Sequence, residues 1–332
     1  MPAKKPNNSL NFAKLAPVFA DADKAREFIE ELRWKGTPNC PHCESEDAYK
    51  LTPKPTSKRP GRKGLYKCNS CRKQFTVTVG TIFESSRIPL NKWLYAIYMM
   101  CSSKKGISAY QLHRELEITY KSAWFLCHRI RHAMTEQPLA GLLKGTIEAD
   151  ETYVGGKKKG IGSGGPGAGG KTIVFSLVER DGKARSFVVD DVKKPTLQGM
   201  IRDHVDPESE IHTDQHRSYG GVAKPVHNEA GQMVHPGFKA HESVDHSIEE
   251  YSRGDVTTNT AESFFALFKR GIVGAFHHIS KQHTSRYLGE FDFRWNRRKD
   301  DDGERFLMAI IMGEGKRLFY RVPKMLAEGN PA

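Results

Sequence analysis

The sequence predicts an α+β protein of two or three domains, and three observations support this prediction. Two cysteine pairs lie near the amino terminus, three helical patterns follow them, and the second half alternates strand-like and helical segments. A chain of 332 residues exceeds one typical domain, and 38% hydrophobic residues suffice to fill cores of ordinary size. We therefore expect a cysteine-stabilised module, a helical domain and a mixed sheet domain, in that order.

The cysteine pairs form two C-x-x-C motifs, CPHC at Cys40–Cys43 and CNSC at Cys68–Cys71, which are separated by 24 residues. Four thiolates close a tetrahedral Zn²⁺ site, and each C-x-x-C bends the backbone enough to present two sulfurs. The spacing predicts a structural zinc ribbon. Its ligands would be Cys40, Cys43, Cys68 and Cys71.

A redox or disulfide pair is the alternative interpretation of these motifs. The sequence shows no secretory signal, however, and the other two cysteines, Cys101 and Cys127, lie in apolar helical patterns that predict core positions. His42 lies inside the first motif, where the cysteines already complete the site. We expect a zinc ribbon in a reducing cytoplasm, with His42 facing solvent.

Two segments rich in glycine and lysine are expected to be loops. Residues 50–64 are basic, rich in proline and glycine, and poor in side chains that build a core. Residues 157–170 hold three lysines followed by a glycine-rich run, and they do not match a nucleotide-binding loop because an apparent strand follows them. Both loops could contact phosphate or form solvated surface.

Three helical patterns follow the ribbon and predict a helical domain. They cover residues 90–101, 108–117 and 119–134, and the three together resemble a helix-turn-helix. The last pattern carries cations around an apolar stripe, so it could enter a DNA groove; a plain helical bundle is the alternative. Its candidate DNA-contacting residues are Lys121, Arg129 and Arg131.

The second half of the chain predicts a mixed sheet. Asp181-Gly182 is a strong hairpin signal between two strand-like runs, which form an antiparallel meander with the strand before them. A helix at 195–205 and two further strands follow. The expected strands are 145–150, 171–178, 184–189, 211–214 and 237–244.

Three acidic residues stand in distinctive settings within this half. Asp150 and Asp214 end strand-like runs, and Glu262 lies in an aromatic-rich helix. A divalent-metal site needs hard oxygen ligands that converge from separate rigid elements. These acids could hold two Mg²⁺ ions about 3.5–4 Å apart, which stabilise the attacking and leaving oxygens in phosphodiester displacement. The set predicts a nuclease-type site.

The helix that carries Glu262 could be capped by Thr258 or Asn259. Lys269 follows Glu262 by seven residues, close to two helical turns, so both side chains project from nearly the same face. A lysine can meet a phosphate as a point charge. A metal-binding acid and a phosphate-binding base would therefore share one site.

Other acids compete for these roles, because the chain has 39 acidic residues and an isolated one is usually a solvated surface charge. The competitors are Glu151, Asp190, Asp191, Asp245 and Asp255. The combined context favours the chosen set, since two strand ends are followed by a helix with a phased lysine.

Aromatic and basic residues are combined near the end of this half. Tyr287, Phe291 and Trp295 are four residues apart, which predicts that their rings pack in the core. His277 and His278 could flank the metal site or bind a DNA strand. Candidates for DNA phosphate contacts are Arg294, Arg297 and Arg298.

The charge balance favours a nucleic-acid partner. The chain has 52 lysine plus arginine residues against 39 aspartate plus glutamate, a formal net charge of +13, although soluble basic proteins without such a partner are common. No run of eighteen apolar residues occurs, so neither a transmembrane helix nor a membrane partner is expected.

Several stretches, in order from about residue 36 to residue 298, resemble DDE-type transposases of bacterial insertion sequences, in the zinc-ribbon group related to the eukaryotic Merlin elements. Some relatives have asparagine as the third residue, whereas Glu262 matches the acidic version. The matching stretches are EADETYVGGK, HTD, VDHS, NTAESFFALFKRGIVGAFHHIS and RYLGEFDFRWNRR. The resemblance covers most of the chain.

This resemblance implies a ribonuclease H-like catalytic domain, whose order of strand meander, helix, strand and helix agrees with the pattern above. It implies that Asp150, Asp214 and Glu262 bind two catalytic Mg²⁺ or Mn²⁺ ions, with Lys269 as an added basic residue. The implied partners are double-stranded DNA, as terminal repeats and target, and at least one more copy of the chain. The implied location is the bacterial cytoplasm, on the nucleoid when bound to DNA.

The full expectation is an α+β multidomain protein with a zinc ribbon, a helix-turn-helix-like domain and a ribonuclease H-like catalytic domain. The expected segments are a flexible amino terminus at 1–20, the ribbon with a preceding helix at 21–86, the helical domain at 87–140, the catalytic domain at 141–300 and a tail at 301–332. Its expected activity is transposition, in which cleavage releases a 3′ hydroxyl that attacks target DNA. The alternatives are a metal-dependent nuclease without strand transfer and a catalytically inert DNA-binding regulator.

Overall fold

The computed structural model describes residues 10–52, 61–136, 141–155, 170–245, 248, 250 and 252–320. The chain divides into two compact units, the first of residues 1–103, 107–134 and 300–332, and the second of residues 104–106 and 135–299. Most of the two predicted glycine-rich loops lies outside the described residues. Among the helices of the described residues, none is long and apolar enough to cross a membrane.

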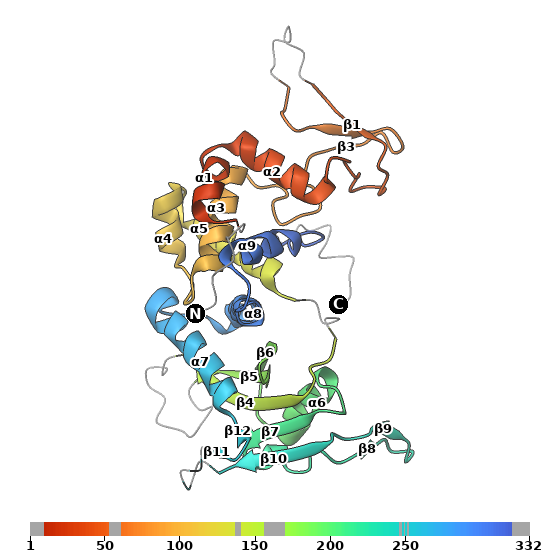
Figure 1. The fold of residues 1–332 in the computed structure, drawn as a ribbon, viewed down its shortest axis with the longest axis vertical. Helices are drawn as coiled ribbons and strands as arrows, with labels where there is room; N and C mark the ends of the chain where they lie inside the picture. Colours follow the sequence, from red (N-terminus) through yellow and green to blue (C-terminus); the bar gives the residue numbers. More distant parts are fainter. Residues whose placement is uncertain are drawn as a thin grey trace, which may run out of the picture. The chain divides into compact units, whose positions relative to one another are not determined.

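The first unit is mainly helical and carries a small antiparallel sheet (Figure 1). Its helices are α1 (Phe12–Ala20), α2 (Ala22–Trp34), α3 (Leu90–Ser102), α4 (Ala109–Leu116), α5 (Tyr120–Met134) and α9 (Asp302–Ile311). Its strands are β1 (Ala48–Lys50), β2 (Tyr66–Cys68) and β3 (Gln74–Phe75). The three helical patterns predicted after the ribbon are present as α3, α4 and α5.

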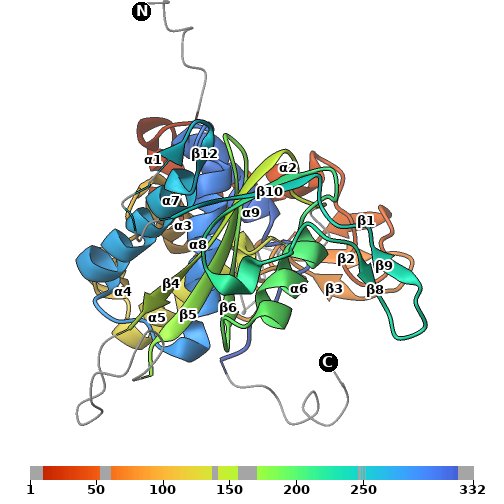
Figure 2. The same ribbon diagram turned by 90° about the horizontal axis from the view of Figure 1, so that it is seen from below.

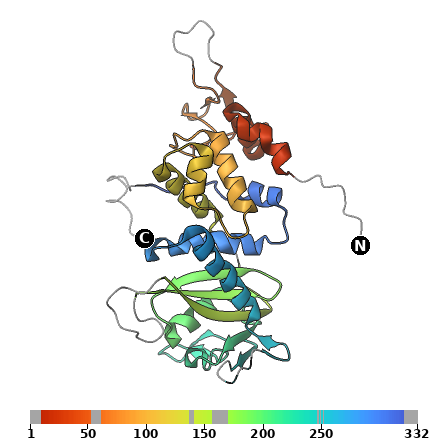
Figure 3. The same ribbon diagram turned by 90° about the vertical axis from the view of Figure 1, so that its left-hand side faces the viewer.

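Two helices of this unit are not predicted from the sequence. Residues 12–20, expected to be flexible, form α1, which Asn11 caps. Part of the expected tail forms α9, which begins with a capping box at Asp301. The Phe306 ring of α9 lies 5.8 Å from the Tyr98 ring of α3, and Figure 3 shows α9 in blue beside α3 in orange. Contacts between segments distant in sequence therefore order both ends of this unit.

The second unit is built on a five-stranded sheet with the order β10-β7-β4-β5-β6. Its strands are β4 (Thr146–Val154), β5 (Thr172–Glu179), β6 (Ala184–Val189), β7 (Glu210–Asp214) and β10 (Ala240–Val244). β4, β5 and β6 form the predicted antiparallel meander, whereas β7 runs parallel to β4 and β10 runs parallel to β7. Its helices are α6 (Lys194–His204), α7 (Asn259–Gly271), which continues into a π-helical turn (Ile272–Phe276), and α8 (Lys281–Asn296).

Smaller elements complete the second unit. They are a 3₁₀ turn (Arg217–Tyr219) and two hairpins, β8 (Val226–His227) with β9 (Met233–His235), and β11 (Ser252–Arg253) with β12 (Val256–Thr257). The 3₁₀ turn follows β7 closely, so it brings Tyr219 to the sheet beside the end of that strand.

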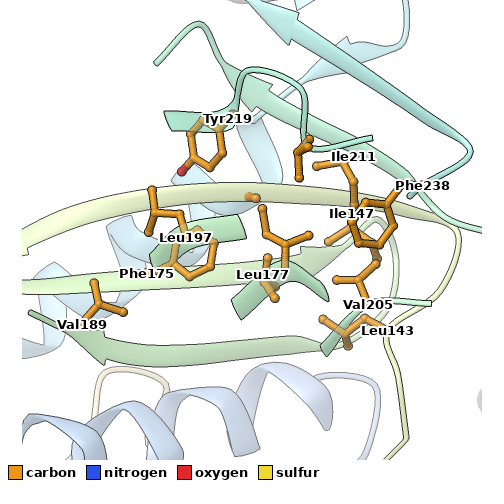
Figure 4. Close-up of a cluster of buried hydrophobic side chains, with 13 residues drawn as sticks. Leu143, Ile147, Phe175, Leu177, Val189, Leu197, Val205, Ile211, Tyr219 and Phe238 are labelled. Carbon is orange, nitrogen blue, oxygen red and sulfur yellow. The ribbon is translucent and has the colours of Figure 1, made fainter. Parts of the chain in front are cut away.

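Helices cover both faces of the five-stranded sheet, with α6 in front and α8 behind in Figure 2. On the α6 face, Leu197 packs with Phe175 in the cluster drawn in Figure 4. On the other face, Phe264 of α7 packs in one cluster with Val174. Because side chains alternate along a strand, the even-numbered residues of β4, including Asp150, face α7.

α8 also covers the outer edge of β6 with two polar side chains. Asn296 accepts a hydrogen bond from the Ala184 N–H (2.6 Å) and donates to the Ala184 carbonyl (3.1 Å). Asp292 accepts from the Ser186 N–H (2.9 Å) and hydroxyl (2.7 Å). Burial raises the pKa of Asp292 to about 7, although both bonds from Ser186 lower it. These contacts satisfy backbone groups that an open strand edge would expose.

The buried side chains confirm the core positions predicted from the sequence. Cys101 and Cys127 are buried in the helical unit. Tyr287 and Phe291 of α8 are buried in the cluster beneath α7, and Trp295 packs against the same cluster while partly buried. The spacing of four residues therefore gives one apolar face on α8.

Candidate functional site

The first candidate site is the cysteine cluster of Cys40, Cys43, Cys68 and Cys71, whose sulfurs all lie within 4.8 Å of one another. The Cys40 and Cys71 sulfurs are 3.7 Å apart, and those of Cys43 and Cys68 are 3.6 Å apart. Tetrahedral coordination with Zn–S bonds of about 2.3 Å places sulfurs about 3.8 Å apart. The cluster therefore has the spacing and donor set of a structural zinc site, and His42 beside it is exposed as predicted.

The backbone around the cysteine cluster favours the thiolate form. The Cys71 N–H donates to the Cys68 sulfur (3.5 Å) and is the largest cause that lowers the pKa of that thiol. The Ser45 N–H likewise lowers the pKa of Cys43, but burial and the neighbouring thiols outweigh it and raise that pKa. A thiolate, and not a thiol, is the form that binds a metal ion. The strand β2 thus delivers the Cys68 ligand, and the turn that follows it supplies an N–H that favours its ionised form.

The second candidate site is in the second unit, where three elements carry the predicted metal ligands. Asp214 ends β7, and Asp150 lies in the middle of the neighbouring strand β4. The strands run parallel with Glu148 opposite His212, so two residues further along both acids project from the face that α7 covers. Glu262 lies in the first turn of α7. We call Asp150, Asp214 and Glu262 the acid cluster.

The prediction that Asp150 ends a strand is wrong. β4 continues to Val154, because its last four residues pair with the first four of β5, from Glu151 opposite Phe175 to Val154 opposite Thr172. The polar and aromatic residues after Asp150 hide this extension from a hydrophobic pattern. Asp150 consequently lies within a paired strand, opposite Ser176 of β5.

The carboxylates of the acid cluster act on one another. Burial raises the pKa of Asp150 to about 7, and the charges of Glu151, Asp214 and Glu262 raise it as well. The Glu151 N–H, which donates to Asp150 Oδ1 (2.8 Å), lowers it. Like charges gathered in a partly buried place disfavour ionisation, and a divalent cation reverses this effect. The donor set therefore fits a hard divalent cation.

Glu148 connects β4 to the start of α7 and is fully buried. Its Oε2 accepts hydrogen bonds from the N–H groups of Thr260 (2.7 Å) and Ala261 (3.0 Å). Its Oε1 accepts from the Thr260 hydroxyl (2.9 Å) and from Arg180 (3.0 Å). A carboxylate at these positions satisfies the amides that a helix start leaves open and matches the helix dipole. Glu148 therefore fixes the turn of α7 that carries Glu262.

The predicted cap of α7 by Thr258 or Asn259 is wrong. Thr258 occupies the N-cap position, but its side chain makes no capping hydrogen bond. The cap comes instead from Glu148, which is more than a hundred residues earlier in the chain. The sequence pattern predicts that Glu148 and Asp150 lie on the same face of one strand. It does not predict the contact of Glu148 with α7, because that contact depends on tertiary packing.

Glu151 is a fourth carboxylate next to the acid cluster, on the opposite face of β4. Burial raises its pKa, a hydrogen bond from the Tyr219 hydroxyl lowers it, and the charge of Asp214 raises it. Tyr219 is buried against the α6 face of the sheet. The orientation of Glu151 is therefore set by a core side chain.

Comparisons with known proteins connect both sites to one family. Residues 142–296 match the model of an ISXO2-like transposase domain, and residues 20–74 match the model of a transposase zinc-ribbon domain. The chain belongs to the insertion-sequence transposases with an amino-terminal zinc ribbon. The acid cluster falls within the first match and the cysteine cluster within the second.

A relative in Halobacterium salinarum supports this family assignment. Its name is "Uncharacterized protein in transposable element ISH50", and the two sequences are 26% identical over 291 residues. The similarity covers 83% of this chain and 92% of the relative. It therefore includes at least part of each matched domain and the helices between them.

The first unit buries two of the three basic residues predicted to contact DNA from α5. Arg129 and Arg131 are both buried, and Arg129 donates to the Glu84 carbonyl (2.7 Å) with its guanidinium 5.1 Å from the Trp93 ring. Burial lowers the pKa of Arg129 to about 10. These positions contradict the prediction, because the second half of α5 is enclosed by the unit. Lys121, in the exposed first turn of α5, keeps its predicted access.

The three arginines predicted to contact phosphate at the end of α8 differ in access. Arg294 is almost enclosed and pairs with the buried Glu290, so it serves packing rather than DNA. Arg297 is half-buried. Arg298 is exposed and donates to the Gly182 carbonyl (2.7 Å). Arg298 therefore remains the most accessible of the three.

Proposed function

We propose that the second unit is a ribonuclease H-like domain that cleaves and joins DNA with DDE chemistry. The strand order β10-β7-β4-β5-β6, an antiparallel meander extended by two parallel strands, supports this fold. The observation that carries the chemistry is the placement of Asp150 on β4, Asp214 at the end of the neighbouring strand β7 and Glu262 in the first turn of α7. Burial, and then the charges of the neighbouring acids, raise the pKa of Asp150. Asp150 is thus near enough to both other acids for their charges to act on it.

The acid cluster would hold two Mg²⁺ or Mn²⁺ ions. When bound, such ions stabilise the attacking and leaving oxygens of phosphodiester displacement. Among the described residues, the cysteines are the only group of three or more potential ligands whose donor atoms all lie within 4.8 Å of one another, so the carboxylates are more widely spaced. Two ions shared among the acids suit this spacing better than one.

The other polar residues of the second unit would position the acids and the DNA. Glu148 would hold α7 so that Glu262 faces Asp150. Lys269, exposed on the face of α7 that carries Glu262, would bind a phosphate of the substrate strand. The positive charge of Lys269 would then lie beside the DNA backbone where the substrate strand passes the acid cluster.

The first unit would recognise double-stranded DNA at the ends of the element. α4 and α5 are joined by a three-residue turn that begins with the left-handed Glu117, as in a helix-turn-helix. Lys121 in the first turn of α5 would reach the groove, since recognition helices contact bases with their amino-terminal residues. Joining two element ends would require at least two copies of the chain.

A strand-transfer assay on element-end DNA with Mg²⁺ or Mn²⁺ tests this function. It compares the unaltered protein with Asp214→Ala and with the control Asp190→Ala, whose carboxylate is 92% exposed and pairs with Lys281 (2.9 Å). We expect joined products from the unaltered protein and from the control, and none from Asp214→Ala. Cleavage without joining favours a nuclease, and DNA binding without either reaction favours an inert regulator.

A further inference from the structure

A cavity of about 280 Å³ lies at the carboxyl-terminal end of α7, within the second unit. Its walls include Val154 at the end of β4, Lys269 of α7, and Ile272 with Val273 of the π-helical turn. His277 lines it as well. This volume is close to the lower end of the range for small-molecule pockets, about 300 Å³. The cavity therefore suits a ligand no larger than about one nucleotide.

The cavity continues a line of exposed residues that begins at the acid cluster. Lys269 and Val273 follow Glu262 by seven and eleven residues, which places all three on nearly one face of the helix. All three are exposed, and Val273 is 75% exposed. From Glu262 to Lys269 the helix rises about 10 Å, close to three nucleotide steps of about 3.4 Å each.

The chemistry of the walls matches a nucleotide. Val154, Ile272 and Val273 offer apolar surface to the face of a base, and the residues that line the cavity include no acid. Lys269 and His277 supply nitrogen groups that can bind phosphate. A base bonded in a duplex cannot enter a cavity of this size with its partner, so the nucleotide must be unpaired.

The backbone of the cavity wall has an unusual conformation. Ile272–Phe276 is a π-helical turn, closed by a hydrogen bond from the His277 N–H to the Ile272 carbonyl (2.6 Å). His277 itself has a φ of 58°, which is uncommon for a residue other than glycine. π-helical turns within α-helices occur often at functional sites. The turn presents Val273 to solvent and His277 to the cavity.

We propose that this cavity binds one unpaired nucleotide of the substrate strand, with its base against Val273 and Ile272 and its phosphate at Lys269. The cavity would lie about three nucleotides from the phosphodiester at the acid cluster. This inference rests on the proposed function, because it assigns the cavity to the same DNA strand. It predicts that the protein prefers DNA that is already frayed over a fully paired duplex.

The test compares the affinity for two fluorescein-labelled duplexes of one sequence, one fully paired and one with an unpaired arm. Ca²⁺ replaces Mg²⁺ so that binding is measured without cleavage. We expect the unaltered protein to bind the frayed duplex more tightly, on the order of fivefold, which is the lower end of the range for aromatic stacking because the contacting side chains are aliphatic. Val273→Ser should reduce this ratio to about one while keeping affinity for the paired duplex.

Val234→Ser is the matched control, because Val234 of β9 is 61% exposed and lies away from the cavity walls. It should keep the preference for the frayed duplex. Equal affinity of the unaltered protein for both duplexes overturns the inference, as does a preference that Val273→Ser leaves intact. An equal loss on both duplexes in Val273→Ser also overturns it, because the residue would then act on all DNA.

Failure of this inference differs from failure of the proposed function. If the unaltered protein joins DNA but Val273→Ser keeps the preference, the function stands and the cavity has another role. If the preference depends on Val273 but the unaltered protein neither cleaves nor joins DNA, the cavity assignment stands and the proposed chemistry fails. The two assays share the protein but not the readout.

Discussion

The cysteine cluster and the acid cluster are both candidate metal sites, but they are assembled in opposite ways. The four cysteines come from residues 40–71, and their sulfurs already have the spacing of a tetrahedral ion. The acids come from two strands and a helix spread over residues 150–262. Packing of α7 against the sheet, and not local spacing, brings them together.

This difference predicts how each site fails. The small ribbon has little core of its own, so its metal should hold it together. The acid cluster is the reverse case, because the sheet and helices hold the acids whether or not an ion binds. Removing a ligand should therefore unfold the ribbon but leave the second unit folded and inactive.

Cys68→Ser tests the first half of this comparison and should have the largest effect. A structural zinc ion contributes on the order of 10 kcal/mol to the folding of a small metal domain. We expect metal analysis to find about one zinc ion per unaltered chain and almost none in the variant. His42→Ala, which changes an exposed residue in the same segment, should keep its zinc. Equal zinc in both variants would contradict the assignment.

Glu148→Gln tests whether packing assembles the acid cluster. The amide cannot accept all four hydrogen bonds, and it leaves Arg180 without its buried counter-charge, so the free energy of unfolding should fall by about 4 kcal/mol. Urea unfolding measures this change, and strand joining should fall with it. Glu210→Gln, in a more exposed pair with Lys239, should cost less than about 1 kcal/mol. A similar cost for both variants would show that α7 is held by other contacts.

Asp292 is a buried carboxyl outside the acid cluster, and Asp292→Asn serves as a reference for the variants within it. Its pKa of about 7 lies above the ordinary 3.8, so the folded chain holds the proton more tightly than the unfolded chain. The stability from this group is complete below pH 3.8 and is lost as the pH rises toward 7, by about 4 kcal/mol. Urea unfolding at several pH values should show a flatter profile in the variant. Identical profiles would mean that folding does not change the pKa of Asp292.

Asp150→Asn should have the smallest effect on stability and the opposite sign. Burial and three neighbouring carboxylates disfavour its charge, so removing that charge in metal-free buffer should raise the free energy of unfolding by about 1 kcal/mol. The same change should abolish strand joining. Thermal melting in the presence of a chelator measures the gain. A clear loss of stability would show that Asp150 is primarily a structural residue.

The sequence predicts the parts of the molecule whose signal is local. The cysteine spacing predicts the ribbon ligands, and the Asp181-Gly182 pair with its flanking runs predicts the β5–β6 hairpin. Tyr287 and Phe291 predict the buried face of α8 by their spacing alone. In each case the residues that determine the structure are close together in the sequence, so a local sequence pattern is enough to predict it.

The features that the sequence does not predict depend on distant partners. α9 is ordered by aromatic contacts such as Phe306 with Tyr98, and the cap of α7 comes from Glu148 on β4. Arg129 and Arg131 have the composition of a DNA-contacting face, but the surrounding helices bury them. The charge of a residue indicates what a surface could bind only when the residue is known to be exposed.

Iron-mediated cleavage of the protein backbone tests the central claim, that Asp150, Asp214 and Glu262 share divalent ions, most directly. Fe²⁺ replaces Mg²⁺ at such sites and, with ascorbate and peroxide, generates radicals that cut the nearby chain. We predict cuts close to all three acids, suppressed by excess Mg²⁺ and lost in Asp150→Asn. Cuts elsewhere in the second unit, or cuts at these acids that persist in Asp150→Asn, would contradict the account.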